Sequence, residues 1–109
     1  MSVNETNVVD GLAVANEGET LVLLITDHLP WDDEQGHIKA LQSKINAYIS
    51  FWRSGQYEKI SSASGVKFCS VEIRMMYEPT EEAIKFLENA NKNLLMFDMG
   101  IIVHIDEQK

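Results

Sequence analysis

The chain has 109 residues, of which 45% are hydrophobic and 24% charged, and 17 acidic residues against 9 Lys and Arg give a formal net charge of -8. This length predicts one domain over residues 1–109, with flexible ends at 1–6 and 107–109, and the hydrophobic fraction excludes wholesale disorder. The negative charge argues against nucleic acid and membranes as partners, because Lys and Arg bind both, and it favours a basic partner.

Two runs of β-forming residues come first in the chain, at 8–15 and Thr20–Asp27. They flank the segment Asn16-Glu17-Gly18-Glu19, whose Asn and Gly are typical of a hairpin turn. The second run contains LVLLI, which is apolar at consecutive positions. Apolar groups on both faces of a strand predict a central place in the sheet.

The clearest predicted element is a helix between Asp32 and Gly55. Apolar residues recur there at spacings of three and four and define a buried stripe: Ile38, Leu41, Ile45, Tyr48 and Trp52. The residues expected on the polar side are Lys39, Gln42, Ser43, Lys44 and Asn46. Asp32 is the expected N-cap, with Gln35 three residues later as in a capping box, and Gly55 is a typical stop signal.

A Ser-rich loop at 56–65 is predicted to separate this helix from a strand at 66–77, which Pro79 ends. Apolar and polar residues alternate along that strand, so one face is expected to be buried. The apolar face comprises Cys69, Val71, Ile73, Met75 and Tyr77. A thiol on such a face lacks the electropositive, exposed setting of a reactive cysteine, so Cys69 is interpreted as a core residue.

The last two predicted elements are a helix and a short strand. Thr80 is the expected N-cap of the helix, which runs to about Asp98 and is closed by Gly100. Residues 101–105 form the final apolar strand. The resulting order, ββαβαβ, makes each helix a crossover between two strands. We therefore predict an α+β fold of two layers, in which two helices cover a four-stranded sheet. The pattern predicts neither the strand order nor the oligomeric state.

Features of cellular context point to the cytoplasm. The first residues, MSVNETNVVDG, lack a positively charged segment followed by an apolar one, so we expect no secretory signal. The longest apolar run, at 21–25, is too short to cross a bilayer. A single cysteine excludes an intramolecular disulfide and a Cys-based zinc site.

Motifs of the common enzyme chemistries are missing from the sequence. There is no GxSxG elbow and no GxxxxGK[ST] phosphate loop, so we expect no catalytic residue, no cofactor and no enzymatic activity. His104 lies in the apolar run IIVHI and is interpreted as a strand histidine rather than a general base.

Potential metal ligands concentrate in the segment Asp27 to His37, where a candidate set comprises Asp27, His28, Asp32 and His37. Helix capping already explains Asp32, and no HExxH spacing is present, so we predict no metal site. An enzyme that binds a metal or small molecule through this segment is kept as an alternative.

Charge is distributed unevenly. Residues 1–38 contain eight acidic residues and no Lys or Arg, whereas 39–74 contain six basic and two acidic residues, and 75–109 seven acidic and three basic. The hairpin and the helix start are therefore the predicted negative pole, which either serves solubility or docks a basic protein. Trp31 is interpreted either as a staple at the helix start or as an interface anchor. The predicted partner-binding residues are Glu17, Glu19, Asp27, Trp31, Asp32, Asp33 and Glu34.

Residues 27–56 resemble a family of small bacterial domains of unknown function. The pattern of that family is DHL, a nearby Trp, a His, then LQxKINAYxxF and SGQ. It is matched here by Asp27-His28-Leu29, Trp31, His37, Leu41-Gln42, Lys44 to Tyr48, Phe51 and Ser54 to Gln56. A weaker resemblance continues through YEPTEEAIKFL to the last strand. The resemblance implies no catalytic residues.

Small acidic bacterial proteins of this kind are similar in type to immunity proteins, which neutralise toxins of contact-dependent growth inhibition or secretion systems. Many such toxins are nucleases, which are basic because they hold a phosphate backbone. The similarity implies a non-enzymatic immunity protein that binds and neutralises a basic toxin of the nuclease class. A regulatory adaptor that acts on a housekeeping protein is the remaining alternative.

Overall fold

A computed structural model of the chain describes residues 9–15, 18–55, 57 and 65–106. Its elements are β1 (Gly11–Ala15), β2 (Thr20–Asp27), α1 (Glu34–Ser54), β3 (Phe68–Met75), α2 (Glu81–Leu94), the 3-10 turn η4 (Leu95–Phe97) and β4 (Met99–Ile105). The expected flexible ends at 1–6 and 107–109, and most of the loop at 56–65, lie outside the described residues.

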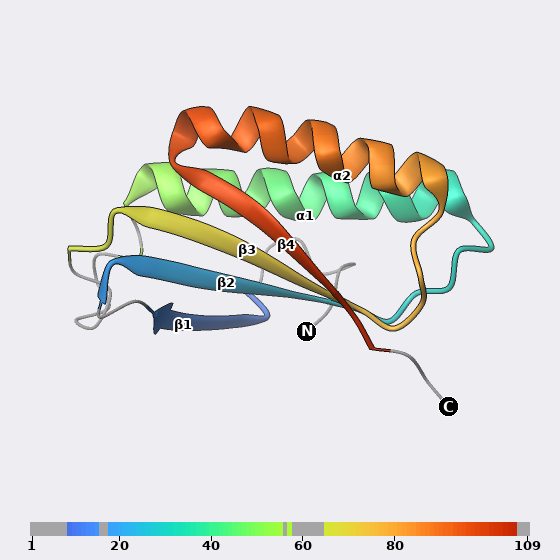
Figure 1. Cartoon of the computed structure of the whole chain (residues 1–109), viewed down its shortest axis with the longest axis horizontal. Helices are drawn as coiled ribbons and strands as arrows, with labels where there is room; N and C mark the ends of the chain where they lie inside the picture. Colours follow the sequence, from blue (N-terminus) through green and yellow to red (C-terminus); the bar gives the residue numbers. More distant parts are fainter. Residues whose placement is uncertain (1–8, 16–17, 56, 58–64, 107–109) are drawn as a thin grey trace.

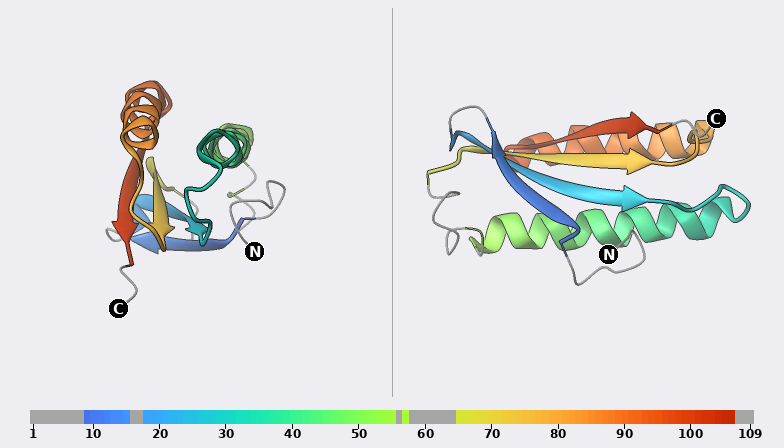
Figure 2. Two further views of the ribbon diagram at one scale, coloured as in Figure 1. Left: turned by 90° about the vertical axis from the view of Figure 1, so that its right-hand side faces the viewer. Right: turned by 90° about the horizontal axis from the view of Figure 1, so that it is seen from below.

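The four strands form one mixed sheet in the order β1-β2-β3-β4. β1 is antiparallel to β2, whereas β2, β3 and β4 are parallel to one another. Both helices lie on the same face of the sheet (Figures 1 and 2). The predicted two-layer α+β fold and the central place of β2 are therefore confirmed. Within the described ranges, neither helix is long and apolar enough to cross a membrane.

The core lies between the sheet and the two helices. Along β2 every second residue is buried, and Leu21, Leu23 and Ile25 are each 0% exposed. β3 contributes Cys69, so this residue is in the core as predicted. The other core residues of β3 and the helices are Val71, Ile73, Met75, Leu41, Ile45, Tyr48, Leu87 and Leu94. Period-two burial arises because neighbouring side chains of a strand point to opposite faces.

The first helix begins one residue later than expected. Its N-cap is Asp33, whose Oδ1 accepts a hydrogen bond of 3.1 Å from the N–H of Gly36, so the prediction of Asp32 is wrong. A Cβ at residue 36 would collide with the Asp33 carboxylate, which explains the glycine there. Gly55 ends the helix in the left-handed conformation, as predicted.

The second helix is shorter than expected. Thr80 is confirmed as its N-cap, but α2 ends at Leu94 rather than near Asp98. The chain reverses at Asp98, which has a φ of 60° and a ψ of 40°, and Gly100 lies inside β4. The expectation that Gly100 closes the helix is wrong because aspartate tolerates the left-handed conformation.

Candidate functional site

Three strand ends and two helix starts meet at one end of the molecule. β2, β3 and β4 are parallel, so their carboxyl ends share one edge of the fold, and α1 and α2 both begin there (Figure 1). Backbone hydrogen bonds hold the strand ends together. The N–H of Met76 donates to the carbonyl oxygen of Asp27 at 2.9 Å, and the N–H of Asp106 donates to the carbonyl oxygen of Met75 at 2.7 Å. Ligands of parallel sheets commonly bind at this end.

A contact between Asp27 and His37 holds the loop from β2 to α1. The Asp27 carboxylate places Oδ2 2.5 Å from Nε2 of His37, and its Oδ1 accepts from the Leu29 N–H at 3.1 Å. Nδ1 of His37 lies 3.2 Å from the carbonyl oxygen of Pro30. The Trp31 ring stacks on His37 with centroids 3.6 Å apart. Both nitrogens of His37 therefore face protein oxygens at hydrogen-bond distance, so neither is directed towards open space where a metal ion could bind.

The four side chains of the candidate metal set do not converge. Asp27 and His37 are each 3% exposed and pair with each other, whereas His28 and Asp32 are exposed to solvent. Among residues 9–15, 18–55, 57 and 65–106, no group of three or more His, Cys, Asp or Glu is placed to hold a metal ion. Asp27 and His37 thus have an evident structural role, which is to close the loop.

Trp31 connects the two loops of this end. Besides stacking on His37, its Nε1 donates to the carbonyl of Tyr77 at 3.4 Å, which joins the β2–α1 loop to the β3–α2 loop. The ring is half-buried against the core, as a staple would be. Tyr77 was expected on the buried face of a strand but is 44% exposed, because β3 ends at Met75.

Acidic side chains gather around these loops. The residues that we call the acidic end are Asp32, Asp33, Glu34, Glu78, Glu81, Glu82 and Asp106. All are exposed except the half-buried Glu34. They come from the start of α1, the loop before α2, the first turn of α2 and the residue after β4. The end of the fold at which the parallel strands finish thus carries seven acidic residues, six of them exposed.

The predicted negative pole is only partly correct. Glu19 precedes β2 and Asp32 follows it, so the eight residues of that strand, roughly 25 Å long, separate the hairpin turn from the helix start. Asp27 was also predicted to bind a partner, but its burial against His37 removes it from the surface. Glu17 lies outside the described residues. Of the predicted set, Trp31, Asp32, Asp33 and Glu34 lie together at the acidic end.

Counting charge along the chain missed the acidic residues of the second helix. Glu78, Glu81 and Glu82 lie about 45 residues after the start of α1 but at the same end of the fold. The element order ββαβαβ could have predicted this position, because two successive crossovers between parallel strands start both helices at the same edge of a sheet.

A buried polar network, which the sequence did not predict, links the middle of α1 to the sheet. Lys44 was expected on the polar side but is 0% exposed, and its Nζ lies 2.9 Å from Oδ1 of Asp10. Oδ2 of Asp10 accepts from the N–H of Thr26 at 2.9 Å. The Tyr48 hydroxyl accepts from the Asp10 N–H at 3.0 Å and donates to the carbonyl of Leu24 at 2.6 Å. The network therefore joins α1, β2 and the residue before β1.

Burial suppresses the ionisation of two core residues. It raises the pKa of the Cys69 thiol from 9.0 to about 12. It also raises the pKa of the Tyr48 phenol from 10.0 to about 12; the N–H of Asp10 that donates to the phenol opposes this rise, and the Asp10 carboxylate adds to it. Folding therefore retains both protons to a higher pH than the unfolded chain does.

The free energy of unfolding is expected to stay constant up to about pH 9 and to fall as the pH approaches 12. The sign follows because both protonated forms are favoured by folding, so the unfolded chain loses these protons first. Urea unfolding between pH 8 and pH 12 measures the effect. Cys69→Ala and Tyr48→Phe serve as controls, and each should make the alkaline decrease shallower. An equally steep decrease in both variants would contradict the assignment.

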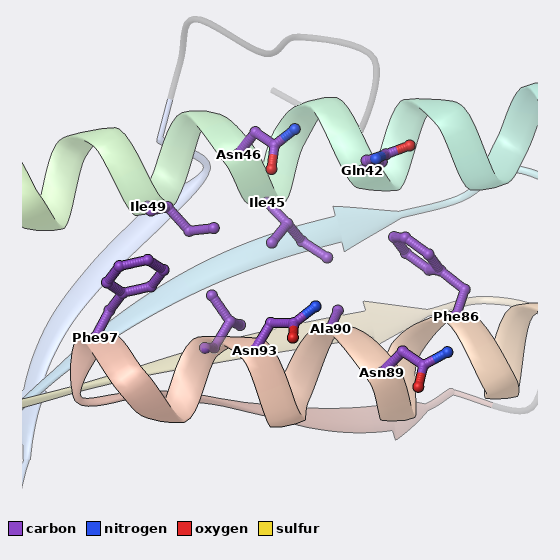
Figure 3. Close-up of a pocket in the computed structure, with 10 residues that line it drawn as sticks. Gln42, Ile45, Asn46, Ile49, Phe86, Asn89, Ala90, Asn93 and Phe97 are labelled. Carbon is purple, nitrogen blue, oxygen red and sulfur yellow. The ribbon is translucent and has the colours of Figure 1, made fainter.

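Two of the hollows among the described residues lie beside α1. One of about 330 Å³ lies beside the β2–α1 loop and includes Asp32, Asp33 and His37 in its lining. The other, of about 290 Å³, lies between α1 and α2 (Figure 3). Its lining combines apolar side chains with four side-chain amides. The apolar residues are Ile45, Ile49, Phe86, Ala90, Leu94 and Phe97, and the amides belong to Gln42, Asn46, Asn89 and Asn93. Charged residues line the first hollow and not the second, so the first belongs to the acidic end.

Comparison with known proteins yields one family. The model described as "Family of unknown function (DUF6572)" matches residues 1–107. No curated protein and no solved structure shows a significant match. The family description names no activity, and the expected membership of a family of unknown function is correct to that extent. Because the match spans nearly all of its 109 residues, the chain belongs to this family of unknown function.

Proposed function

We propose that this protein is a non-enzymatic immunity protein that binds and neutralises a basic bacterial toxin of the nuclease class in the cytoplasm. The observation that carries the proposal is the acidic end, which combines acidic residues of both helix starts. A nuclease holds the phosphate backbone through Lys and Arg, so an inhibitor with clustered carboxylates competes for the same side chains.

The geometry of the loops favours a recognition surface. Asp27, His37 and Trp31 hold the two loops in place, so the acidic groups are presented on an ordered frame and lose little freedom on binding. In the part of the chain that the structure describes, no hydrogen bond or ion pair engages the side chains of Asp32 and Glu82. Such carboxylates are available to a basic partner.

Co-expression tests the proposal. The protein is co-expressed with the product of the neighbouring reading frame, and growth and co-purification are measured. The expected result is a stable complex and rescue of growth. Failure of both, with a neighbouring product that is toxic by itself, would contradict the proposed function.

Charge reversal in the complex tests the acidic end. The double variant Asp32→Lys/Glu82→Lys should slow association at least tenfold and flatten its dependence on salt, because attraction over distance mainly raises the association rate. Stopped-flow or surface-based kinetics at several ionic strengths measure both quantities. Each single variant is compared with Glu19→Lys, which makes the same change in net charge at the opposite end and should alter the rate less than twofold. Equal slowing by all single variants would show that net charge alone matters.

A further inference from the structure

The outer edge of β4 exposes unpaired backbone groups. β4 is the last strand of the sheet and lies beneath α2 (Figure 2). In its parallel ladder the N–H of Cys69 donates to the carbonyl of Asp98, at 3.0 Å, so even-numbered residues of this segment direct their backbone groups towards β3. The N–H and C=O groups of Val103 and Ile105 therefore point away from β3, towards the free side of the sheet edge.

One outward group of this edge already has a side-chain partner. The N–H of Ile101 donates to Oδ1 of Asn91 at 2.8 Å, which confirms the outward direction of the odd-numbered residues. The outward backbone groups of Val103 and Ile105 form no hydrogen bond with any other residue in the described ranges. The half of the edge nearest the acidic end is thus open to a further strand.

An apolar hollow runs beside this open edge. It has a volume of about 340 Å³ and lies between α2 and β4. Its apolar lining includes Ile84, Leu87, Ile101, Val103 and Ile105. Ile84 and Ile105 are 43% and 41% exposed. A strand that pairs with β4 would direct every second side chain towards this hollow, so backbone and side chains would both find complementary groups.

Protective features common at sheet edges are missing from β4. Its sequence, MGIIVHI, contains no Lys, no Glu and no Pro. Edge strands that are not meant to pair usually carry such residues or a bulge. The open backbone groups specify the class of occupant, because only an extended polypeptide supplies N–H and C=O groups at the matching spacing.

Charge around the edge decides between a second copy and another protein. Glu88 lines the hollow, and Asp106 directly follows β4. Pairing the β4 edges of two copies would join two molecules that each carry a net charge of -8, with Glu88 and Asp106 of both beside the joint. Lys or Arg in the added strand would instead meet Glu88 and Asp106.

We propose that the β4 edge binds an extended, basic segment of a partner protein as an additional strand. This inference rests on the proposed function for the basic character of the partner. The β4 edge borders the acidic end and shares Asp106 with it, but its principal contact is backbone pairing at Val103 and Ile105.

The probe is a synthetic eight-residue peptide that alternates Lys and Val, titrated into isotope-labelled protein and followed by NMR. The largest shift changes are expected at Val103 and Ile105, and their amide hydrogens should exchange at least tenfold more slowly with the peptide bound. The amides of Ile102 and His104 already donate to β3 and serve as internal controls. A peptide with Glu in place of Lys should bind at least tenfold more weakly.

Two variants separate backbone pairing from general attraction. Val103→Pro removes an outward N–H without removing a bond to β3, and proline is tolerated at such edge positions. It should weaken peptide binding at least tenfold. Ile84→Ser should weaken binding about fivefold, whereas Leu95→Ser, at a 59% exposed residue outside the hollow, should change it less than twofold. A version of the synthetic peptide that is methylated at alternate backbone nitrogens, titrated into the wild-type protein, tests backbone pairing without any change to the protein.

Several results would overturn the inference. These are no binding of the Lys-Val peptide, equal binding of the methylated peptide, or shift changes confined to the acidic end or to the hollow between α1 and α2. Concentration-dependent dimerisation that Val103→Pro abolishes would make a second copy the occupant and would also overturn it. Toxin association that depends on Asp32 and Glu82 but not on Val103 would leave the proposed function intact. Peptide binding without any toxin association would contradict the proposed function alone.

Discussion

Replacing Asp10 by alanine is expected to lower the free energy of unfolding by about 3 to 5 kcal/mol, because breaking a buried ion pair by removal of one partner is strongly destabilising. The side chains of Asp10 and Lys44 are both 0% exposed, and their charged atoms lie 2.9 Å apart. The same substitution also removes the acceptor for the N–H of Thr26. Equilibrium unfolding in urea, followed by circular dichroism, measures the loss.

A double-mutant cycle identifies the ion pair as the cause. Asp10→Asn and Lys44→Met should each destabilise the protein, whereas the double variant Asp10→Asn/Lys44→Met should recover at least half of the loss of Asp10→Asn, because it removes both charges. Glu19→Ala removes an exposed carboxylate and should change the free energy by less than about 0.5 kcal/mol. Additive effects of the two charge-removing substitutions would show that the pair contributes nothing as a pair.

Replacing Asp27 by alanine is expected to lower the free energy of unfolding by about 2 to 3 kcal/mol and to loosen the β2–α1 loop. The substitution removes the acceptor 2.5 Å from His37 Nε2 and the acceptor of the Leu29 N–H. Buried donors that lose their acceptors cost about this much. Because Trp31 stacks on His37, its indole should become more exposed as well.

Unfolding in urea and quenching of Trp fluorescence by acrylamide measure the two effects of Asp27→Ala. Trp52 lies far along α1, so the Trp52→Phe background isolates the signal of Trp31. Asp32→Ala, in the same loop and at an exposed acidic residue, is the matched control and should leave stability and quenching close to those of the parent. A loss of stability without any change in Trp31 quenching would contradict the role of the pair in holding the loop.

Local sequence patterns predicted the strands and helix boundaries correctly where a single residue was the clear candidate for a position. Alternation in β3 placed Cys69 correctly in the core, and Gly55 and Thr80 were found as helix boundaries. Local signals failed where two neighbours compete. Asp32 and Asp33 are both good N-caps, and a hydrogen bond to Gly36 selects the second. Asp98 makes the turn that glycine was expected to make at Gly100.

Lys44 shows why charge by itself does not indicate the exposed side of a helix. It follows Leu41 by three residues and precedes Tyr48 by four, which places it on the buried stripe. Its charge suggested the opposite side. The carboxylate that stabilises it there comes from a residue 34 positions away, before β1. Helical spacing was therefore the better guide to the position of Lys44 than its polarity.

The sequence by itself determined the order of the elements, the shared face of the two helices and the excess of negative charge, because these follow from local periodicity, crossover topology and composition. Only the tertiary structure decided which charges meet. It buried Asp10 with Lys44 and Asp27 with His37, and it moved Glu19 away from Asp32. The physical reason is that such contacts join residues distant in the chain, and they depend on strand order and direction, which no local pattern encodes.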